Sequence, residues 1–460
     1  MMWMSSLSFR SQTWALVLNM SNPQCTLSVF LLFCLVLMLL AIFRLSEASV
    51  TRGFCCLFIF RYWRLVVGIV SYFSHQCIPI CIAPRFGPDD ILAILPTINP
   101  KSKELLDTVI SVLESGVGHV IVVVPQDKYA DVNFFQRLDL VKHLATGRLR
   151  IEKCSVTNKR RQVSVGLRCN SKLRKSIVVL VDDHVLWPSG PKFLSSILAP
   201  FQDAEVGGVA MWKKGIRKTC TLFSSTDFWN LIGCLYLERH NFDITASHFV
   251  DGGLFVISGR TAAYRSEILC TEDFIQAFCN EQWWCFGNIG AINCDDDNFI
   301  TRWLVNKRWK IGWQHGSDAT MVTTIGETGF EKFNSQCLRW ARTTWRQNSK
   351  TLVTDRIVYS TQPWSVYSIF VTSFLNFALF TDVSLVYLSW SRDRRFLWFM
   401  MVWIFCSKLV KPIPHFFRHP RDLVYLFPYI LFGYYHSLLK LYALFTARNI
   451  SWGSRPGVVN

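Results

Sequence analysis

The chain has 460 residues and a formal net charge of +17, with 51% hydrophobic and 18% charged residues. This composition is typical of a membrane protein and argues against a fully soluble enzyme, while the length allows one sizeable domain with additional segments. The positive charge indicates anionic partners: nucleic acid, acidic lipid and nucleotide-activated substrates all fit. The 16 cysteines contain no CxxC pair, so the sequence indicates neither a zinc site nor a disulfide framework.

Residues 1–83 are predicted to form an N-terminal membrane region. Residues 26–43, "TLSVFLLFCLVLMLLAIF", are an apolar run close to the ~20 residues that cross a bilayer, and we interpret them as a retained anchor helix. Residues 54–73 are a second candidate, although Arg61 and Arg64 lie near the middle of this run. A helix lying in the membrane interface is the alternative for this second segment.

Residues 84–348 have the composition of a globular domain. Short apolar runs rich in β-branched residues alternate with helical patterns such as "KSKELLDTVISVLESG", which predicts an α/β fold with a mostly parallel sheet. The predicted strands are "DILAILPTI", "HVIVVVP", "SIVVLVDD" and "GGLFVIS".

Residues 349–460 are predicted to form a C-terminal membrane region. Its apolar segments cover about residues 364–390, 396–410 and 423–447, and they are separated by the connectors "SRDRR" and "KPIPHFFRHPRD". Because the globular domain and the second connector are basic, we place both on the cytoplasmic side. The expected protein is multi-pass, with its catalytic domain between membrane helices at both ends.

Two carboxylates and an imidazole, Asp182, Asp183 and His184, follow a predicted buried strand directly. Ligands of open α/β sheets bind beyond the carboxyl ends of the strands, so these side chains are candidates for a divalent metal site. An imidazole among the ligands favours Mn²⁺ over Mg²⁺. The alternative is a solvated turn after the strand.

A second acidic group consists of Asp295, Asp296 and Asp297. Adjacent carboxylates raise each other's proton affinity, which can poise a general base near neutral pH. The alternative is an acidic helix N-terminus, since "NFITRWLVN" has a helical pattern.

Cations occur in "TNKRRQ", which contains Lys159, and in "QCLRWARTTWR", residues 336–346. Guanidinium groups pair bidentately with phosphate oxygens, and indole rings stack on sugar faces. A solvated face or a lipid-headgroup contact is the alternative for either run.

In their order and context, these motifs resemble those of the processive family 2 glycosyltransferases, which include hyaluronan, chitin and cellulose synthases. The resemblance is closest to the fungal capsule-polysaccharide-synthase-like branch. It covers about residues 91–346, and "SWGSR" at residues 451–455 is similar to the WGTR box of hyaluronan and chitin synthases. It implies a GT-A catalytic fold and a membrane-embedded, inverting enzyme of the plasma membrane. The enzyme would polymerise sugars from a UDP-sugar donor and export the polysaccharide.

The resemblance also implies a role for individual residues of the donor site. Pro96, Thr97 and Asp127 would contact the uridine, and Lys159 would reach the pyrophosphate. Asp182 and His184 would occupy the two ligand positions of the Asp-x-Asp metal motif, with Asp183 between them. His184 departs from the family pattern, in which the second ligand is Asp.

For the acceptor side, the resemblance places Ser258, Gly259 and Arg260 at the tip of a strand that lines the acceptor pocket. Asp297 matches the final acid of the family's Thr-Glu-Asp or Gly-Asp-Asp box, which makes it the expected catalytic base, with Asp296 beside it. "QCLRW" is a QxxRW motif, so Gln336, Arg339 and Trp340 would bind the diphosphate and the acceptor end.

The expected partners are therefore a UDP-sugar, the growing polysaccharide and membrane lipids. The spanning helices argue against nucleic-acid binding. A non-processive enzyme that adds one sugar to a lipid remains the alternative. Three C-terminal spans would place "SWGSR" on the far side of the membrane, so one segment is expected to lie in the interface or to contain a hairpin. The segment 364–390, which contains Asp382, is the one we expect to do so.

Overall fold

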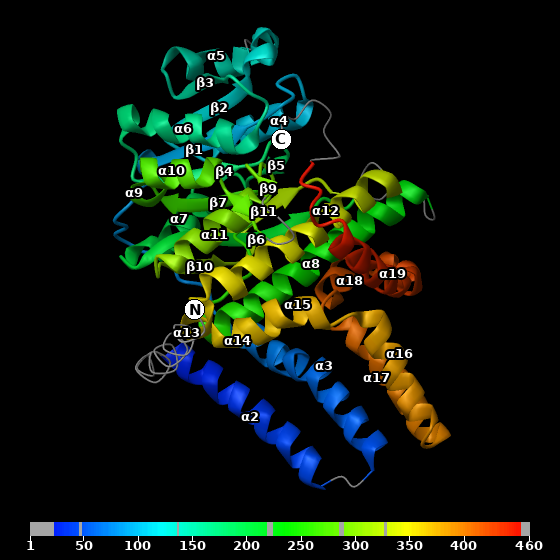
Figure 1. Ribbon diagram of the computed structural model, residues 1–460. Coiled ribbons are helices and arrows are strands. Elements are labelled where there is room, and N and C mark those ends of the chain that lie inside the picture. Colours follow the sequence, from blue (N-terminus) through cyan, green and yellow to red (C-terminus); the bar gives the residue numbers. More distant parts are fainter. Residues whose placement is uncertain are drawn as a thin grey trace. The chain divides into compact units, whose positions relative to one another are not determined.

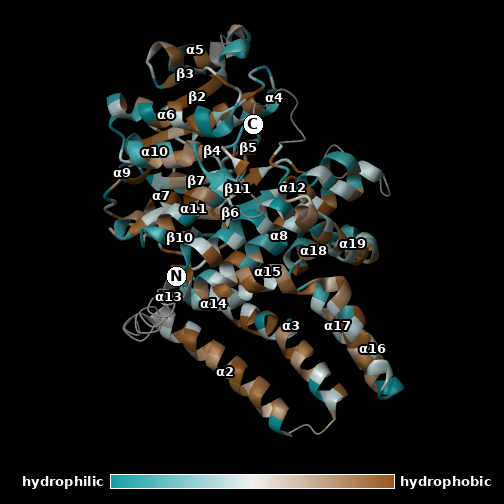
Figure 2. Ribbon diagram, viewed as in Figure 1, coloured by the Kyte–Doolittle hydropathy of each residue, from teal (hydrophilic) through white to brown (hydrophobic). Residues whose placement is uncertain are grey.

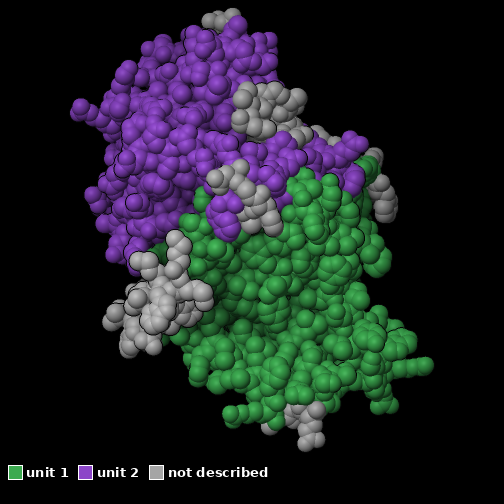
Figure 3. All heavy atoms as spheres, viewed as in Figure 1, with its two compact units in different colours: residues 1–75, 223–255, 340–446 green, residues 76–222, 256–339, 447–460 purple. Residues whose placement is uncertain are grey.

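The computed structural model describes residues 23–45, 48–135, 138–218, 224–284, 289–325 and 329–451. The chain divides into two compact units, which Figure 3 shows in different colours. Unit 1 comprises Met1–His75, Phe223–Phe255 and Trp340–Thr446. Unit 2 comprises Gln76–Leu222, Val256–Arg339 and Ala447–Asn460.

Unit 2 is built around a mixed β-sheet (Figure 1). Within the described residues, its nine strands have the order β3-β2-β1-β4-β7-β6-β11-β5, and β10 also pairs with β6. β1 pairs in parallel with β2 and β4, whereas β7 is antiparallel to both β4 and β6. The predicted mostly parallel sheet is confirmed. The strands are β1 Ile91–Pro96, β2 His119–Pro125, β3 Leu149–Cys154, β4 Ile177–Val181, β5 Val185–Leu186, β6 Val206–Gly215, β7 Thr261–Arg265, β10 Lys310–Gln314 and β11 Thr320–Thr323. Two further strands, β8 Gln282–Trp283 and β9 Ile289–Gly290, form a separate pair.

Helices cover the faces of this sheet and explain why its central strands are apolar along their whole length. All six residues of β1 are buried. On one face, Ile91, Ala93 and Leu95 belong to a core that also contains residues of α4 and α7. On the other face, α6 approaches β1 so closely at Gly166 that an added Cβ would lie 2.5 Å from Ile94. The helices of unit 2 are α4 Lys103–Glu114, α5 Leu138–Ala145, α6 Lys159–Leu173, α7 Lys192–Leu198, α9 Ser266–Leu269, α10 Glu272–Cys279 and α11 Asp296–Asn306.

The expectation of a strand at "GGLFVIS" is wrong. Residues 252–258 follow helix α8, Ser225–Asp251, without entering the sheet, and β7 begins only at Thr261. The backbone of this segment bonds to side chains instead of to a neighbouring strand: the Gly253 N–H donates to Asp251 Oδ1 and the Ile257 N–H donates to Thr301 Oγ1. Burial of the segment thus required no β-ladder.

Unit 1 is helical (Figure 1). One apolar cluster joins Leu35 of α2, Val67 of α3 and Val250 of α8, and another joins Phe54 of α3 to Leu385 of α16 and to residues of α17. Its helices are α2 Pro23–Leu45, α3 Ser49–Ser74, α8, α13 Val358–Thr361, α14 Pro363–Ser365, α15 Thr372–Leu375, α16 Ala378–Trp390, α17 Arg394–Leu409, α18 Ile413–Arg418 and α19 Leu426–Phe445. Helix α12, Phe330–Ser349, begins in unit 2 and ends in unit 1.

Two helices are long and apolar enough to cross a membrane among those that the structure describes. They span residues Thr26–Arg44, with a mean hydropathy of 2.9, and Ser49–Ser74, with 1.7. Figure 2 shows that most residues of α2 are hydrophobic. The second helix contains Arg61 and Arg64. The predicted second segment, residues 54–73, therefore lies within one continuous helix. The three predicted C-terminal spans stay predictions.

The segment 364–390, which we expected to lie in the interface or to contain a hairpin, contains a sharp break. Helices Pro363–Leu375 and Ala378–Trp390 meet at 84°, an arrangement that suits a broken span or a re-entrant loop. The break lies at Asn376 and Phe377, whereas Asp382 lies inside α16 and is ion-paired with Arg61 and Lys408. Pairing with two cations allows this carboxylate to remain within a helix. Residues 452–455 of the "SWGSR" tail lie outside the described residues.

Candidate active site

The candidate site forms where three strand ends meet at one edge of the sheet of unit 2. β1 and β4 are parallel neighbours, so Thr97 and Asp182 follow their carboxyl ends at the same edge. β7 runs antiparallel to β4, with Val181 opposite Thr261, so the residues just before β7 reach this edge too. The Asp182 N–H donates to the Arg260 carbonyl over 3.0 Å. Sheet topology therefore brings together residues from three distant parts of the sequence.

Lys159 connects two of the acidic motifs. It is the first residue of α6, whose N-terminus is capped by Asn158 through an Arg161 N–H···Oδ1 bond. Its ammonium lies 2.8 Å from Asp182 Oδ1 and 2.9 Å from Asp296 Oδ2. The three side chains are 14%, 21% and 9% exposed, so this is a largely buried ionic bridge.

The bridge controls the charge state of its members. Burial lowers the pKa of Lys159, but Asp182 and Asp296 outweigh this effect and hold its pKa above the ordinary value. Burial likewise raises the pKa of Asp182, but the Lys159 ammonium and the His184 ring outweigh it and keep the pKa below the usual range. Lys159 and Asp182 thus both remain charged at neutral pH.

Asp297 has the opposite electrostatic behaviour. Burial and the neighbouring Asp296 carboxylate raise its pKa, against the effects of Lys159 and of the Gly259 N–H. The Gly259 N–H donates to Asp297 Oδ2 over 3.3 Å, while Oδ1 accepts from the backbone and side-chain N–H groups of Asn298. A carboxylate with a raised pKa, held in a defined orientation, is suited to accept a proton.

Gly259 allows the loop before β7 to approach this cluster closely. A Cβ at this position would lie 3.2 Å from Lys159 Nζ and 3.7 Å from both Asp296 Oδ2 and Asp297 Cβ. Ser258 and Arg260 flank it, and the Arg260 N–H lies 3.5 Å from Ser258 Oγ. The loop predicted for the acceptor pocket therefore contacts the acidic cluster.

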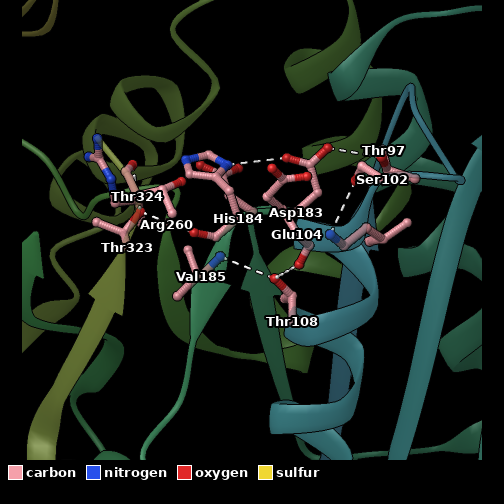
Figure 4. Close-up of polar contacts among 12 residues, drawn as sticks. Thr97, Ser102, Glu104, Thr108, Asp183, His184, Val185, Arg260, Thr323 and Thr324 are labelled. Atoms are coloured by element: carbon pink, nitrogen blue, oxygen red, sulfur yellow. Dashed lines mark hydrogen bonds and ion pairs between the residues drawn. The ribbon is translucent and has the colours of Figure 1, made fainter. Parts of the chain in front are cut away.

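Asp183 and His184 belong to a second group of contacts, shown in Figure 4. Thr97 Oγ1 donates to Asp183 Oδ2 over 2.9 Å, and His184 Nδ1 lies 3.2 Å from Asp183 Oδ1. The His184 carbonyl accepts from Thr323 Oγ1, and the next residue, Val185, donates its N–H to Thr108 Oγ1. These bonds fix the Asp-Asp-His turn between β4 and β5.

The donor atoms present fit a divalent metal only if the substrate supplies further ligands. Within the described part of the chain, no group of three His, Cys, Asp or Glu side chains is arranged to hold a metal. Asp182 and His184 are partly exposed at the strand end and offer one carboxylate and one imidazole. Two protein ligands of this kind suit an ion whose remaining ligands are diphosphate oxygens and water.

Several residues support the site in ways that the sequence did not indicate, including Arg160 of the basic run "TNKRRQ". Arg160 is 1% exposed and binds Glu281 Oε2 at 2.7 Å, the Phe278 carbonyl at 2.8 Å and the Cys294 carbonyl at 2.7 Å. Arg302 of α11 binds the other oxygen of Glu281 at 2.7 Å. This network ties the start of α6, with Lys159, to the segment that begins α11, with Asp296. Arg160 therefore supports the fold, and its neighbour Lys159 reaches the acidic cluster.

Two further buried residues contribute to the site. Gln162 donates through Nε2 to the carbonyls of Thr97 and Val123, which holds the turn after β1. Lys213 of β6 is buried, and burial and the neighbouring Arg260 lower its pKa well below the ordinary value, against the field of Asp297. No local pattern distinguished either residue, because their roles depend on contacts across the sheet.

The remaining predicted residues are placed as follows. Pro96 ends β1 and is buried, whereas Asp127 is exposed just after β2. Gln336 and Arg339 lie on α12, and their contacts with a diphosphate stay predictions. Trp340 stacks on Tyr236 of α8 with ring centroids 4.9 Å apart.

Comparison with known proteins decides the family. Residues 88–343 match the family described as "Glycosyltransferase like family 2". This chain belongs to glycosyltransferase family 2. The "Type 2 glycosyltransferase" of Gibberella zeae is 37% identical to it, over 87% of this chain and 75% of that protein. A protein of the same description from Zymoseptoria tritici is 38% identical, over 88% and 83%. The chain is therefore a glycosyltransferase.

Two further similarities are more distant. An "NDP-glycosyltransferase" of Aspergillus luteorubrus is 26% identical over 61% of this chain and 66% of that protein. Among solved structures, the mannosyltransferase PcManGT from Pyrobaculum calidifontis, in complex with GDP-Man and Mn²⁺, aligns with a TM-score of 0.48 at 15% identity. That alignment covers 87% of this chain and 99% of the mannosyltransferase.

Proposed function

We propose that this glycosyltransferase moves a sugar from a nucleoside-diphosphate donor, UDP in our expectation, to an acceptor hydroxyl with inversion at the anomeric carbon. The proposal rests on one cluster in which side chains that stay charged lie beside a carboxylate that readily takes up a proton. Lys159 and Asp182 are held charged, whereas the adjacent Asp297 has a raised pKa. Such a site can stabilise an anionic leaving group on one side and accept a proton on the other.

The proposed reaction is a single displacement. Asp297 takes the proton of the acceptor hydroxyl, and the hydroxyl oxygen forms a bond to the anomeric carbon. The bond from that carbon to the diphosphate oxygen breaks, and the diphosphate leaves with the electron pair. Lys159 bridges Asp182 and Asp296, and its ammonium can balance the charge that develops on the leaving group.

A divalent ion would be held by Asp182 and His184, with Mn²⁺ favoured over Mg²⁺ because of the imidazole. Such an ion supplies positive charge to the diphosphate when it is bound. Asp183 orients the His184 ring, since Thr97 Oγ1 donates to Asp183 Oδ2 and Asp183 Oδ1 contacts His184 Nδ1.

We further propose that the product is a polysaccharide, that the enzyme is processive and that its membrane helices carry the chain across the plasma membrane. The two candidate spans and the broken helix pair of unit 1 support this, because a single span suffices for stable anchoring. The catalytic unit would face the cytoplasm, where nucleotide sugars are available. Transfer of one sugar to a lipid is the alternative, and the apolar helices of unit 1 suit it equally.

The test is an assay of membranes containing the full chain with UDP-glucose, UDP-glucuronate and UDP-N-acetylglucosamine, each with Mn²⁺, Mg²⁺ or a chelator. We expect metal-dependent UDP release from one donor and a product ladder that grows on a gel. A single product extractable into organic solvent would support the alternative and overturn processivity. Absence of UDP release from every nucleotide sugar tested would overturn the proposed reaction.

A further inference from the structure

Unit 1 contains a group of cationic side chains that the proposed reaction does not use. We call it the cationic cluster; it consists of Arg61, Arg64, Arg239, Lys408, Lys411 and Lys440. These residues come from α3, α8, α17 and its C-terminal end, and α19. α3 packs on α8 and α16, and α16 packs on α17 and α19, so the cluster lies where these helices meet.

Two carboxylates pair with part of the cluster. Asp382 of α16 lies 3.3 Å from Arg61 Nε and 2.5 Å from Lys408 Nζ, and its side chain is only 3% exposed. Asp243 of α8 lies 2.6 Å from Lys411 Nζ. The six cationic side chains of the cluster are thus accompanied by two carboxylates, Asp382 and Asp243.

The other cations contact neutral groups. Arg64 donates through one nitrogen to the Ser368 carbonyl and to Thr372 Oγ1, both at 3.0 Å. The Lys440 ammonium lies 4.5 Å from the centre of the Phe377 ring. Arg239 interacts with the Tyr429 hydroxyl and, like Arg64, lies in the field of Asp243. Asp243 already pairs with Lys411, so these contacts add no further negative charge and leave the excess positive charge in place.

The cations are close enough to repel one another. Arg61 and Arg64 act on Lys440, while Arg64 and Arg239 act on Lys411. Bringing partly buried like charges together is unfavourable unless a counter-charge is present. An anion with one or two negative charges would relieve this repulsion, and guanidinium forks suit tetrahedral phosphate oxygens.

The broken helix adds a further positive element beside Lys440. α16 starts at Ala378, directly after the 84° break, and its Leu379 N–H donates to Ser437 Oγ of α19. Arg61 donates to Asn376 Oδ1 within the break, over 2.7 Å. The N-terminal end of a helix carries partial positive charge, and broken membrane helices direct such ends at anionic groups.

The surroundings indicate how such an anion would arrive. The outer faces of α16, α17 and α19 expose large apolar side chains, among them Phe380, Val383, Trp398, Phe399, Leu431 and Leu438. Figure 2 shows hydrophobic residues along α16 and α17. A water-soluble anion would gain nothing from these faces, whereas acyl chains attached to a phosphate would cover them.

We propose that the cationic cluster binds the phosphate group of a membrane lipid. This inference goes beyond glycosyl transfer, which needs no phosphate in unit 1. The ligand is either an anionic phospholipid or a lipid phosphate that carries or accepts sugar, since both present the same chemistry to the cluster.

The test uses the purified full chain in dodecyl maltoside micelles and measures the binding of fluorescent dioleoyl phosphatidic acid at increasing mole fraction. We expect saturable binding that phosphatidylcholine does not compete for. Lys440→Gln and Arg239→Gln should each weaken it at least tenfold, and Lys440→Arg should retain it. Arg395→Gln removes an exposed cation at the start of α17 and is the matched control, with less than a twofold effect expected.

Thermal unfolding without anionic lipid separates a ligand site from a structural role. Because Lys440 is repelled by its neighbours, Lys440→Gln should then unfold at the wild-type temperature or above it, and only the wild type should gain stability on lipid addition. If a polyprenyl monophosphate displaces the fluorescent phosphatidic acid at lower mole fraction than phospholipids do, the ligand is a sugar-carrier lipid. If only phospholipids displace it, the ligand is a structural phospholipid.

The proposal is overturned by equal binding of phosphatidic acid and phosphatidylcholine, by equal losses in Lys440→Gln and Arg395→Gln, or by full competition from inorganic phosphate. Displacement by a soluble oligouronate would assign the cluster to an acidic polymer and would also overturn it. All of these measurements report binding, so they remain interpretable if the proposed transfer reaction fails.

Discussion

Asp297 combines three influences that rarely coincide on a surface carboxylate. It is partly buried, it adjoins Asp296, and its Oδ2 accepts the Gly259 N–H. The first two raise its proton affinity, and the third fixes its direction. The adjacent Asp296 pairs directly with the Lys159 ammonium. Two neighbouring acids can thus take different roles, one as part of an ionic bridge and one as a base.

Replacement of Asp297 by Asn keeps the size of the side chain and removes the base. We expect kcat to fall by about 10² to 10⁴ while the donor dissociation constant stays within about threefold. UDP release and donor binding measure the two quantities separately. Asp295→Asn is the matched control, since Asn also adopts the left-handed backbone of residue 295, and less than a tenfold loss is expected. Similar losses in both variants would contradict the assignment.

The pH dependence of kcat/KM reports the same group. Asp297 acts only when deprotonated, so activity should be lost as pH falls through a pKa that lies above the ordinary aspartate range. Lys159 lowers this pKa, so Lys159→Gln should move the acidic limb of the profile to higher pH, whatever its effect on the maximal rate. A limb that stays in place, or moves to lower pH, would rule out the electrostatic coupling.

His184 offers a separate test of the metal. We expect His184→Asp to shift the ratio of Mn²⁺-supported to Mg²⁺-supported activity toward Mg²⁺, because Mg²⁺ prefers oxygen ligands. The readout is UDP release over a titration of each ion, together with the dissociation constant of Mn²⁺ by paramagnetic resonance. If the ratio and the Mn²⁺ affinity are both unchanged, His184 is not a ligand.

At the scale of elements, the site depends on how α6 and α11 are held against the sheet. Glu281 pairs with Arg160 of α6 and Arg302 of α11, each at 2.7 Å, and is itself 4% exposed. α6 contributes Lys159 and α11 contributes Asp296 and Asp297. The carboxylate between the two arginines therefore sets the distance between the cation and the acids.

Glu281→Gln should destabilise unit 2 strongly because it removes a buried negative charge that pairs with two largely buried guanidinium groups. The expected loss is about 3 kcal/mol, measured by chemical or thermal unfolding of the purified protein. Glu272→Gln breaks the exposed pair with Arg168 and is the matched control, for which we expect little change in Tm. Equal stability of the two variants would show that the Glu281 network does not support the fold.

At the scale of the whole molecule, the chain combines a catalytic unit with a helical unit. Helix α8 and the end of α12 belong to the helical unit, although the sequence on either side of α8 belongs to the catalytic unit. Residues 223–255 lie between strands of the sheet in the sequence, yet they belong to unit 1. The N-terminal helices α2 and α3 have the length and hydropathy of membrane spans.

Membrane insertion of α2 can be tested directly. Val36→Arg combined with Leu40→Arg places two charges in the middle of the helix, at about 2.5–3.5 kcal/mol each on an insertion scale, and should lower the inserted fraction. Phe43→Arg, beside Arg44 at the helix end, should insert normally. Resistance to alkaline carbonate extraction measures insertion, and equal resistance of both variants would argue against a spanning α2.

The sequence by itself determined what depends on local pattern. "HVIVVVP" coincides with β2, and the helix predicted from "NFITRWLVN" begins within the acidic triplet, at Asp296, because continuous burial and an acidic N-terminus leave marks in a few consecutive residues. Only the tertiary structure decided that Lys159 bridges Asp182 and Asp296, that Arg160 supports the fold, and that the first C-terminal apolar segment, 364–390, breaks at Asn376. Each of these depends on partners brought together by strand order and helix packing, and a partner's identity leaves no periodic mark in the sequence near the residue that it contacts.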